Sequence, residues 1–194
     1  SAAYAGLTVH VLGSDPGVTA AYNGGTHMPL EDGAMYCSIP EATVLDAADY
    51  VQLKSIVSQL PGIRKGVTYT RFPRKDVIQV YGDGTQFEIG ILVDEALKAQ
   101  ELLASEGIAV RVIDMFTWKP LDEELVVKAA RECGKIITCE EHSVIGGLGE
   151  AVCACLSEQC PVPVRRIGVN DEFGHSGPAA ALLKQFGLSA EHIV

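Results

Sequence analysis

The sequence predicts an α/β fold made of two three-layer α/β/α domains. Strand-like apolar runs alternate with amphipathic helix-like segments along nearly the whole chain. In the second half the strand-like runs are continuously apolar, which is typical of parallel strands covered by helices on both faces. Glycine, proline and other turn residues separate the segments. A parallel sheet with right-handed crossovers follows from this order.

The first half predicts short strands and helices. Residues 7–13 alternate as a half-buried strand does, and Pro61-Gly62 ends an amphipathic helix. The predicted strands cover 7–13, 42–47, 66–72 and 77–81, and the predicted helices cover 29–37 and 47–59.

The second half has clearer signals. Asp122 suits the first position of a helix, Pro178 opens another, and a glycine follows the first helix at its end. The predicted helices cover 92–107, 121–133, the segment after 146–149, and 178–186, and the predicted strands cover 108–115, 135–141 and 162–169.

Composition excludes several classes of function. The 15 basic and 25 acidic residues give a net charge of −10, which argues against a nucleic-acid surface. No apolar run has the length of a membrane span, so we expect a cytoplasmic protein without membrane contact. Cys153, Cys155 and Cys160 suggest a metal cluster, but neighbours two apart on a helix face different sides. We favour small buried thiols and assign no metal to this chain.

Residues 22–32 combine an Asn-Gly-Gly turn with a histidine, a proline and two acids. Asn-Gly is a strong hairpin signal between two alternating strands, and only the 7–13 side alternates. Pro29 with Glu31 and Asp32 behind it is typical of the first turn of a helix. We interpret the stretch as a glycine-rich loop leading into a helix N-terminus, where ligands often bind.

Three other polar segments each have two interpretations. Glu-Glu-His at 140–142 ends a predicted strand, where open α/β sheets bind ligands, although charged strand ends are also ordinary surface. Arg71 and Arg74 suit a phosphate or carboxylate clamp, or a solvated basic patch. Gly-Gly-Leu-Gly at 146–149 lacks the full dinucleotide-binding pattern and favours a tightly packed loop before a helix.

Taken in series, the motifs identify a family. The order VLGSDPGV, NGGTHMPLEDGAMYCSIP, TVLDAADYVQ, VTYTRFPR, FEIG, EGIAVRVIDMFTWKPLD, EEHSVIGGLGEAV and RRIGVNDEFGHSG resembles the later two domains of the transketolase family. The chain looks closest to the C-terminal subunit of a split transketolase. Deoxyxylulose-phosphate synthase and the beta-type subunit of 2-oxoacid dehydrogenases share this layout but differ in the glycine loop and the tail.

The resemblance implies a domain division. Residues 1–81 would be the latter half of a pyrimidine-binding domain for thiamine diphosphate, and residues 91–194 a Rossmann-like transketolase C-terminal domain. Residues 82–90 would link them, with a family strand missing after the linker. The catalytic Glu that contacts the cofactor's aminopyrimidine ring is expected upstream, so the sequence is expected to be incomplete and its cofactor-binding residues stay unknown.

Site residues carry over where positions match. His27 corresponds to the family histidine beside the thiazolium ring and substrate, and is the expected catalytic residue. Asn23 stands where the family has an Asp that recognises a substrate hydroxyl, and Gly25 stands where it has Pro. An amide still bonds a hydroxyl, but as a neutral donor and acceptor.

Three further residues are implied to bind substrate. Asp15 occupies a position that is often His in the family and contacts the donor sugar. Arg71 matches the Arg that holds the sugar phosphate at the mouth of the site, and Arg74 is a second candidate. Residues 140–149 are expected to pack between subunits rather than to catalyse.

The resemblance also implies an activity. It is transfer of a two-carbon ketol unit from a ketose phosphate to an aldose phosphate, as in pentose phosphate metabolism, by a transferase that needs its N-terminal part. Thiamine diphosphate would be the cofactor, with Mg²⁺ or Ca²⁺ held mainly by the N-terminal domain or subunit in a homodimer or heterotetramer. The alternatives are a related synthase or dehydrogenase subunit that uses the same cofactor, and a non-catalytic scaffold or regulatory subunit.

Overall fold

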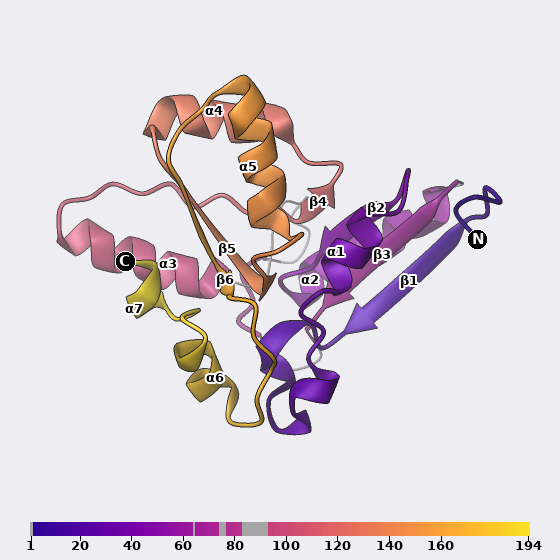
Figure 1. Cartoon of the computed structure of the whole chain (residues 1–194), viewed down its shortest axis with the longest axis horizontal. Helices are drawn as coiled ribbons and strands as arrows, with labels where there is room; N and C mark the ends of the chain where they lie inside the picture. The colour runs from indigo at the N-terminus through magenta and orange to yellow at the C-terminus, as the bar shows by residue number, and fades with distance from the viewer. Residues whose placement is uncertain (1, 64, 74–76, 83–92) are drawn as a thin grey trace.

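The computed structural model describes residues 2–63, 65–73, 77–82 and 93–194, with the backbone alone for 93–98. Both halves combine strands with helices (Figure 1). The α/β class predicted from the sequence is confirmed, and the strands pair in parallel except for one antiparallel edge strand in the first sheet. The boundary predicted near 82–90 falls largely on residues outside the described ones and stays a prediction.

The first half is built on one sheet. Its strands are β1 (Val9–Ser14), β2 (Thr43–Asp46), β3 (Val67–Phe72) and β4 (Thr117–Lys119). The order is β1-β3-β2-β4, with β1, β2 and β3 parallel and β4 antiparallel to β2. β3 lies inside the sheet with nearly every residue buried, because parallel partners flank it on both sides.

The predicted strand at 108–115 is wrong. The described backbone has no regular structure there, and the chain instead adds residues 117–119 to the first sheet. A run of apolar residues forms a strand only where a neighbouring strand can hydrogen-bond to it. Here the pairing with β2 begins only at β4.

Two helices complete the first half: α1 (Asp32–Cys37) and α2 (Tyr50–Gln59). Asp49 begins α2 by accepting a 2.8 Å hydrogen bond from the amide of Gln52. Its other oxygen accepts bonds from the amides of Val80 and Tyr81, both at 3.0 Å. These amides lie in the predicted strand 77–81, where residues 77–82 form no strand, so that prediction is also wrong.

The second half pairs β5 (Ile136–Ser143) in parallel with β6 (Val164–Val169). Helices α4 (Glu123–Cys133) and α5 (Leu148–Gln159) pack on this pair around Val126, Val152 and Leu156 (Figure 1). Asp122 begins α4, as predicted, and Gly134 ends it with a left-handed backbone.

A second apolar cluster joins the two halves. It gathers α3 (Val93–Ser105), α6 (Ala179–Gln185) and α7 (Ala190–Ile193) with the loop that follows β1. Among the described residues, no helix is long and apolar enough to cross a membrane. The loop after β1 is thus anchored to helices that come much later in the chain.

Candidate functional site

The segment between β1 and α1 is a compact loop, not a hairpin. We call residues 15–28 the site loop. It contains two short 3₁₀ helices, η1 (Gly17–Asn23) and η2 (Gly25–His27), and α1 follows four residues after its end. The interpretation of 22–32 as a glycine-rich loop that leads into a helix agrees with this structure.

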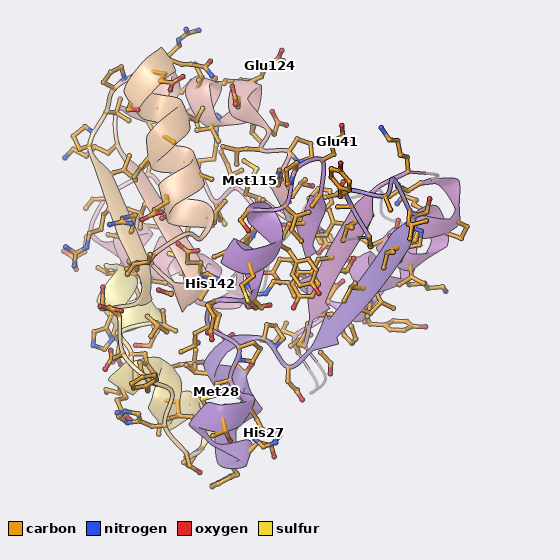
Figure 2. All side chains as sticks on the ribbon, turned by 45° about the vertical axis from the view of Figure 1, so that its right-hand side comes forward. His27, Met28, Glu41, Met115, Glu124 and His142 are labelled. Atoms are coloured by element: carbon orange, nitrogen blue, oxygen red, sulfur yellow. The ribbon has the colours of Figure 1, made fainter. Side chains whose placement is uncertain are left out.

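The outer side of the site loop exposes polar side chains. Asn23, Thr26 and His27 are all exposed, and Tyr22 is 74% exposed. The Thr26 hydroxyl lies 3.0 Å from Nδ1 of His27. Figure 2 shows His27 pointing away from the protein at the end of the loop. Two predicted residues, His27 and Asn23, are therefore both accessible to solvent on the same loop.

The inner side of the site loop is apolar and buried. Val18, Ala20 and Met28 belong to the cluster formed with α6, α7 and β6. Met28 is only 5% exposed. The loop thus has one face that fixes its position and one face that can meet a ligand.

The backbone of the site loop is strained at two non-glycine residues. Asp15 has φ of 59°, and Ala21 has φ of 55° with ψ of −116°. Such conformations cost on the order of 1–3 kcal/mol each and persist where the surroundings fix them, often at functional sites. Asp15 is half-buried and precedes the exposed part of the loop.

Arg71 lies in the interior of the protein. Its guanidinium is fully buried, with Nε 3.1 Å from Oδ2 of Asp32 and Nη1 3.3 Å from Oδ2 of Asp46. Nη2 donates a 3.3 Å bond to the carbonyl of Glu141, and the group lies 4.9 Å from the centroid of the Trp118 ring. We call Asp32, Asp46, Arg71 and Glu141 the charged cluster.

The expectation that Arg71 holds a sugar phosphate at the mouth of the site stays a prediction for this buried guanidinium. A phosphate would have to displace two buried carboxylates that already use the guanidinium. Arg74, the second candidate, lies outside the described residues, so its predicted role stays a prediction.

Burial changes the acidities of the charged cluster. It raises the pKa of Asp46 to about 6, although the cation of Arg71 counteracts the shift. Burial alone would lower the pKa of Arg71, but the carboxylates of Asp46 and Asp32 outweigh it and raise that pKa. The Tyr69 hydroxyl donates a 2.6 Å bond to Asp32. Arg71 therefore stays charged between carboxylates.

The Glu-Glu-His run ends β5 at the junction of the halves, and all three side chains are buried. Glu140 accepts bonds from the amides of Leu148 and Gly149, at 2.7 and 2.9 Å, at the beginning of α5. Glu141 accepts a 2.6 Å bond from the amide of Thr19. The run thus supports the start of α5 and the site loop, and it is not exposed to solvent.

His142 is buried between the halves, as Figure 2 shows. Its Nε2 accepts a 3.4 Å bond from the amide of Ala34, and its ring meets Trp118 edge-on at 5.3 Å. Burial and the nearby Arg71 lower its pKa. Burial also raises the pKa of Glu140 and of Glu141 to about 7 each, against the bonds they accept. Burial therefore shifts all three groups toward their neutral forms relative to the same groups in water.

The cysteines carry no cluster in the part of the chain that the structure describes. All six are free thiols, and no group of three potential metal-ligating side chains is found there. Burial raises the pKa of Cys139 to about 12 and that of Cys155 as well, so both behave as apolar side chains.

The contacts of Asp46, Trp118 and Glu141 with Arg71 could not be predicted from the sequence. They join positions up to 70 residues apart in the chain. The one available signal was the placement of Asp46 and Glu141 at the carboxyl ends of predicted strands, where parallel sheets collect polar groups.

Comparisons with known proteins agree on one family. The family model described as transketolase, C-terminal domain, matches residues 85–193. A transketolase subunit for 6-deoxy-6-sulfo-D-fructose, SqwH, from Clostridium sp. strain MSTE9 is 42% identical over 100% of this chain and 65% of its own length. Rat transketolase is 35% identical over 100% of this chain and 34% of its own length.

A solved structure has the same fold. It is described as a split gene transketolase, inactive beta4 tetramer, and it superposes with a TM-score of 0.89 at 39% identity. The match covers 98% of this chain and 66% of that one. The chain therefore spans about two thirds of the length of the Clostridium subunit and of the split-gene structure, and about one third of the rat enzyme.

Proposed function

Because the chain belongs to the transketolase family through its C-terminal domain, we propose that it acts in two-carbon ketol transfer between a ketose phosphate and an aldose phosphate. The observation that carries the proposal is the site loop, which exposes both His27 and Asn23 while its apolar side chains are buried. An N-terminal section is proposed as the partner, in a dimeric or tetrameric assembly.

The site loop fits the ring side of thiamine diphosphate better than its diphosphate. When bound, thiamine diphosphate supplies the electron sink that carbon–carbon cleavage requires. Asn23, Thr26 and His27 offer amide, hydroxyl and imidazole groups, which suit a polar ring edge and sugar hydroxyls. Residues 15–28 contain no Lys or Arg, so the diphosphate and its Mg²⁺ or Ca²⁺ are assigned to the partner.

In this arrangement each residue of the site loop has a role. His27 holds or moves a proton at the reacting oxygen of the sugar. Asn23 bonds a sugar hydroxyl, and Asp15 is proposed to contact the donor sugar from the start of the loop. The upstream Glu expected to contact the cofactor is assigned to no acid of this chain. Burial of Glu140, Glu141 and Asp32 supports that choice, because none of them faces the exposed side of the loop.

The test is reconstitution of the protein with its N-terminal partner, thiamine diphosphate and Mg²⁺. We expect transfer from a phosphorylated ketose to a phosphorylated aldose that requires both chains. A sulfonated ketose is a second donor to test, because the Clostridium relative is named for one. Absence of turnover with every phosphorylated and sulfonated ketose would refute the proposal.

Two outcomes would favour the alternatives. Turnover of a 2-oxoacid in place of a ketose would indicate a related synthase or dehydrogenase subunit. A stable complex with the N-terminal partner but without any turnover would indicate a scaffold or regulatory subunit.

A further inference from the structure

The second half of the chain holds the site loop near its beginning through Glu141. Oε1 of this residue accepts the amide hydrogen of Thr19 at 2.6 Å. Gly17, with φ of 69°, packs so closely that an added Cβ would lie 2.4 Å from Cγ of Glu141. The side chain of Glu141 is fully enclosed, so this contact cannot be replaced by water at the same place.

A second contact holds the other end of the loop. Between β6 and α6 the chain passes beside η2, and a Cβ added to Gly25 would lie 2.2 Å from the carbonyl oxygen of Gly174 (Figure 1). A Cβ added to Gly174 would lie 2.7 Å from Sδ of Met28. The Ser176 hydroxyl also donates a 3.3 Å bond to the carbonyl of Tyr22. Two backbones therefore meet at van der Waals distance.

The strained Ala21 lies between these two contacts. Its φ of 55° and ψ of −116° are unfavourable for any residue with a Cβ, and would relax if the loop were free. The described contact of the His27 ring is with the neighbouring Thr26 hydroxyl. The position of the imidazole is consequently determined by the backbone conformation of the loop.

We propose that Glu141 and Gly174 are positioning residues that set the place of His27 for the transfer reaction. The inference rests on the proposed function and adds a task for the second half of the chain. Gly25, which stands where the transketolase family has Pro, belongs to the same contact, because a Cβ at this position would collide with Gly174. The close pair of glycines lets the C-terminal segment reach the loop directly.

Gly174→Ala tests the second contact with a matched control. Gly174 has no left-handed backbone, so the added methyl acts through Met28 and Gly25 alone. Gly177→Ala is the control, since its methyl would meet Leu182 at an ordinary 3.6 Å. In the reconstituted complex we expect Gly174→Ala to lower kcat by roughly 10–100-fold with little change in KM, and Gly177→Ala to leave both unchanged.

NMR of the His27 ring gives a readout that does not depend on turnover. With the full chain, Gly174→Ala should shift the His27 ring signals, while Gly177→Ala should leave them in place. Unchanged His27 signals in folded Gly174→Ala, or equal loss of kcat in both variants, would overturn the inference. A wild-type complex without turnover would instead refute the proposed function and leave the NMR comparison valid.

Glu141 provides an independent pair of variants if Gly174→Ala fails to fold. Glu141→Gln keeps an oxygen that can accept the Thr19 amide, whereas Glu141→Ala removes it. We expect Glu141→Ala to shift the His27 signals and lower kcat, and Glu141→Gln to restore both. Wild-type His27 signals in Glu141→Ala would contradict the role of this residue.

Discussion

Arg71 places a permanent charge inside the protein, between the carboxylates of Asp32 and Asp46. Arg71→Ala would leave both carboxylates buried without a cation, so we expect the free energy of unfolding to fall by about 3–5 kcal/mol. Chemical denaturation measures this loss. The control is Arg131→Ala, an exposed side chain on α4, for which a change within about 0.5 kcal/mol is expected.

The same variant decides between two roles for Arg71. An interior role predicts similar loss of turnover for phosphorylated and unphosphorylated ketoses. Unchanged stability with a selective rise in KM for phosphorylated ketoses would contradict the interior role and restore the phosphate-binding role predicted from the sequence.

The sequence singled out Arg71 as a functional candidate but could not predict which residues surround it. The candidate was recognisable because its motif consists of neighbouring residues in the chain. Its partners come from β2, β5 and the start of α1, and their convergence depends on how the strands are ordered in the sheet. The exposed position of His27 was easier to predict, because glycines and polar residues in a loop favour the surface by themselves.

Among the elements, α2 and α4 begin in the same way but in different surroundings. Asp49 and Asp122 each cap a helix by accepting the amide three residues later, at 2.8 and 2.9 Å. Asp49 is buried and also accepts the amides of Val80 and Tyr81. We expect Asp122→Ala to cost about 1 kcal/mol of unfolding free energy and Asp49→Ala at least about 2 kcal/mol.

Denaturation of the two alanine variants checks this difference, and hydrogen exchange locates it. The amides of Val80 and Tyr81 should lose protection in Asp49→Ala and keep it in Asp122→Ala. Equal costs for the two variants would show that Asp49 acts only as a helix cap and that the 77–82 segment does not depend on it.

Element prediction succeeded where local signals were complete. The capped helices and every strand except β4 match the predicted segments within a few residues. The predictions of strands at 77–81 and 108–115 were wrong, because an apolar run cannot specify which neighbouring strand will pair with it. Asp49 takes the amides of Val80 and Tyr81 instead of a strand partner.

In the whole molecule, buried acids make stability depend on pH. Burial raises the pKa of Asp46 to about 6 and those of Glu140 and Glu141 to about 7. The folded state therefore binds more protons than the unfolded state between about pH 4 and 7, and these groups destabilise the fold as pH rises through that window. Burial lowers the pKa of His142 from its ordinary value of 6.5. Below that pH the unfolded state binds more protons at this residue, so its contribution to stability rises as pH increases.

Glu141→Gln isolates one contribution to this dependence. The amide cannot ionise, so the variant should gain stability relative to the wild type as pH rises from 5 to 8, by on the order of 1–3 kcal/mol. Urea denaturation at both pH values measures the difference. A constant difference at pH 5 and 8 would show that Glu141 has an ordinary acidity in the folded protein.

The junction between the two halves is the feature of the whole molecule that the sequence could not predict. Residues 140–149 were expected to pack between subunits, and within this chain they contact the site loop and α1. That arrangement depends on the relative position of two sheets, which no local pattern specifies. Whether this segment also packs between subunits stays a prediction.

The central claim is that the site loop presents His27 to the sugar in a two-carbon transfer reaction. The most direct measurement is the transfer rate of the reconstituted complex with His27→Ala, compared with His192→Ala, which removes another exposed imidazole. The account predicts that His27→Ala lowers kcat by roughly 10²–10⁴-fold without loss of stability, while His192→Ala leaves it unchanged. Equal kcat values for His27→Ala and the wild type would contradict the account.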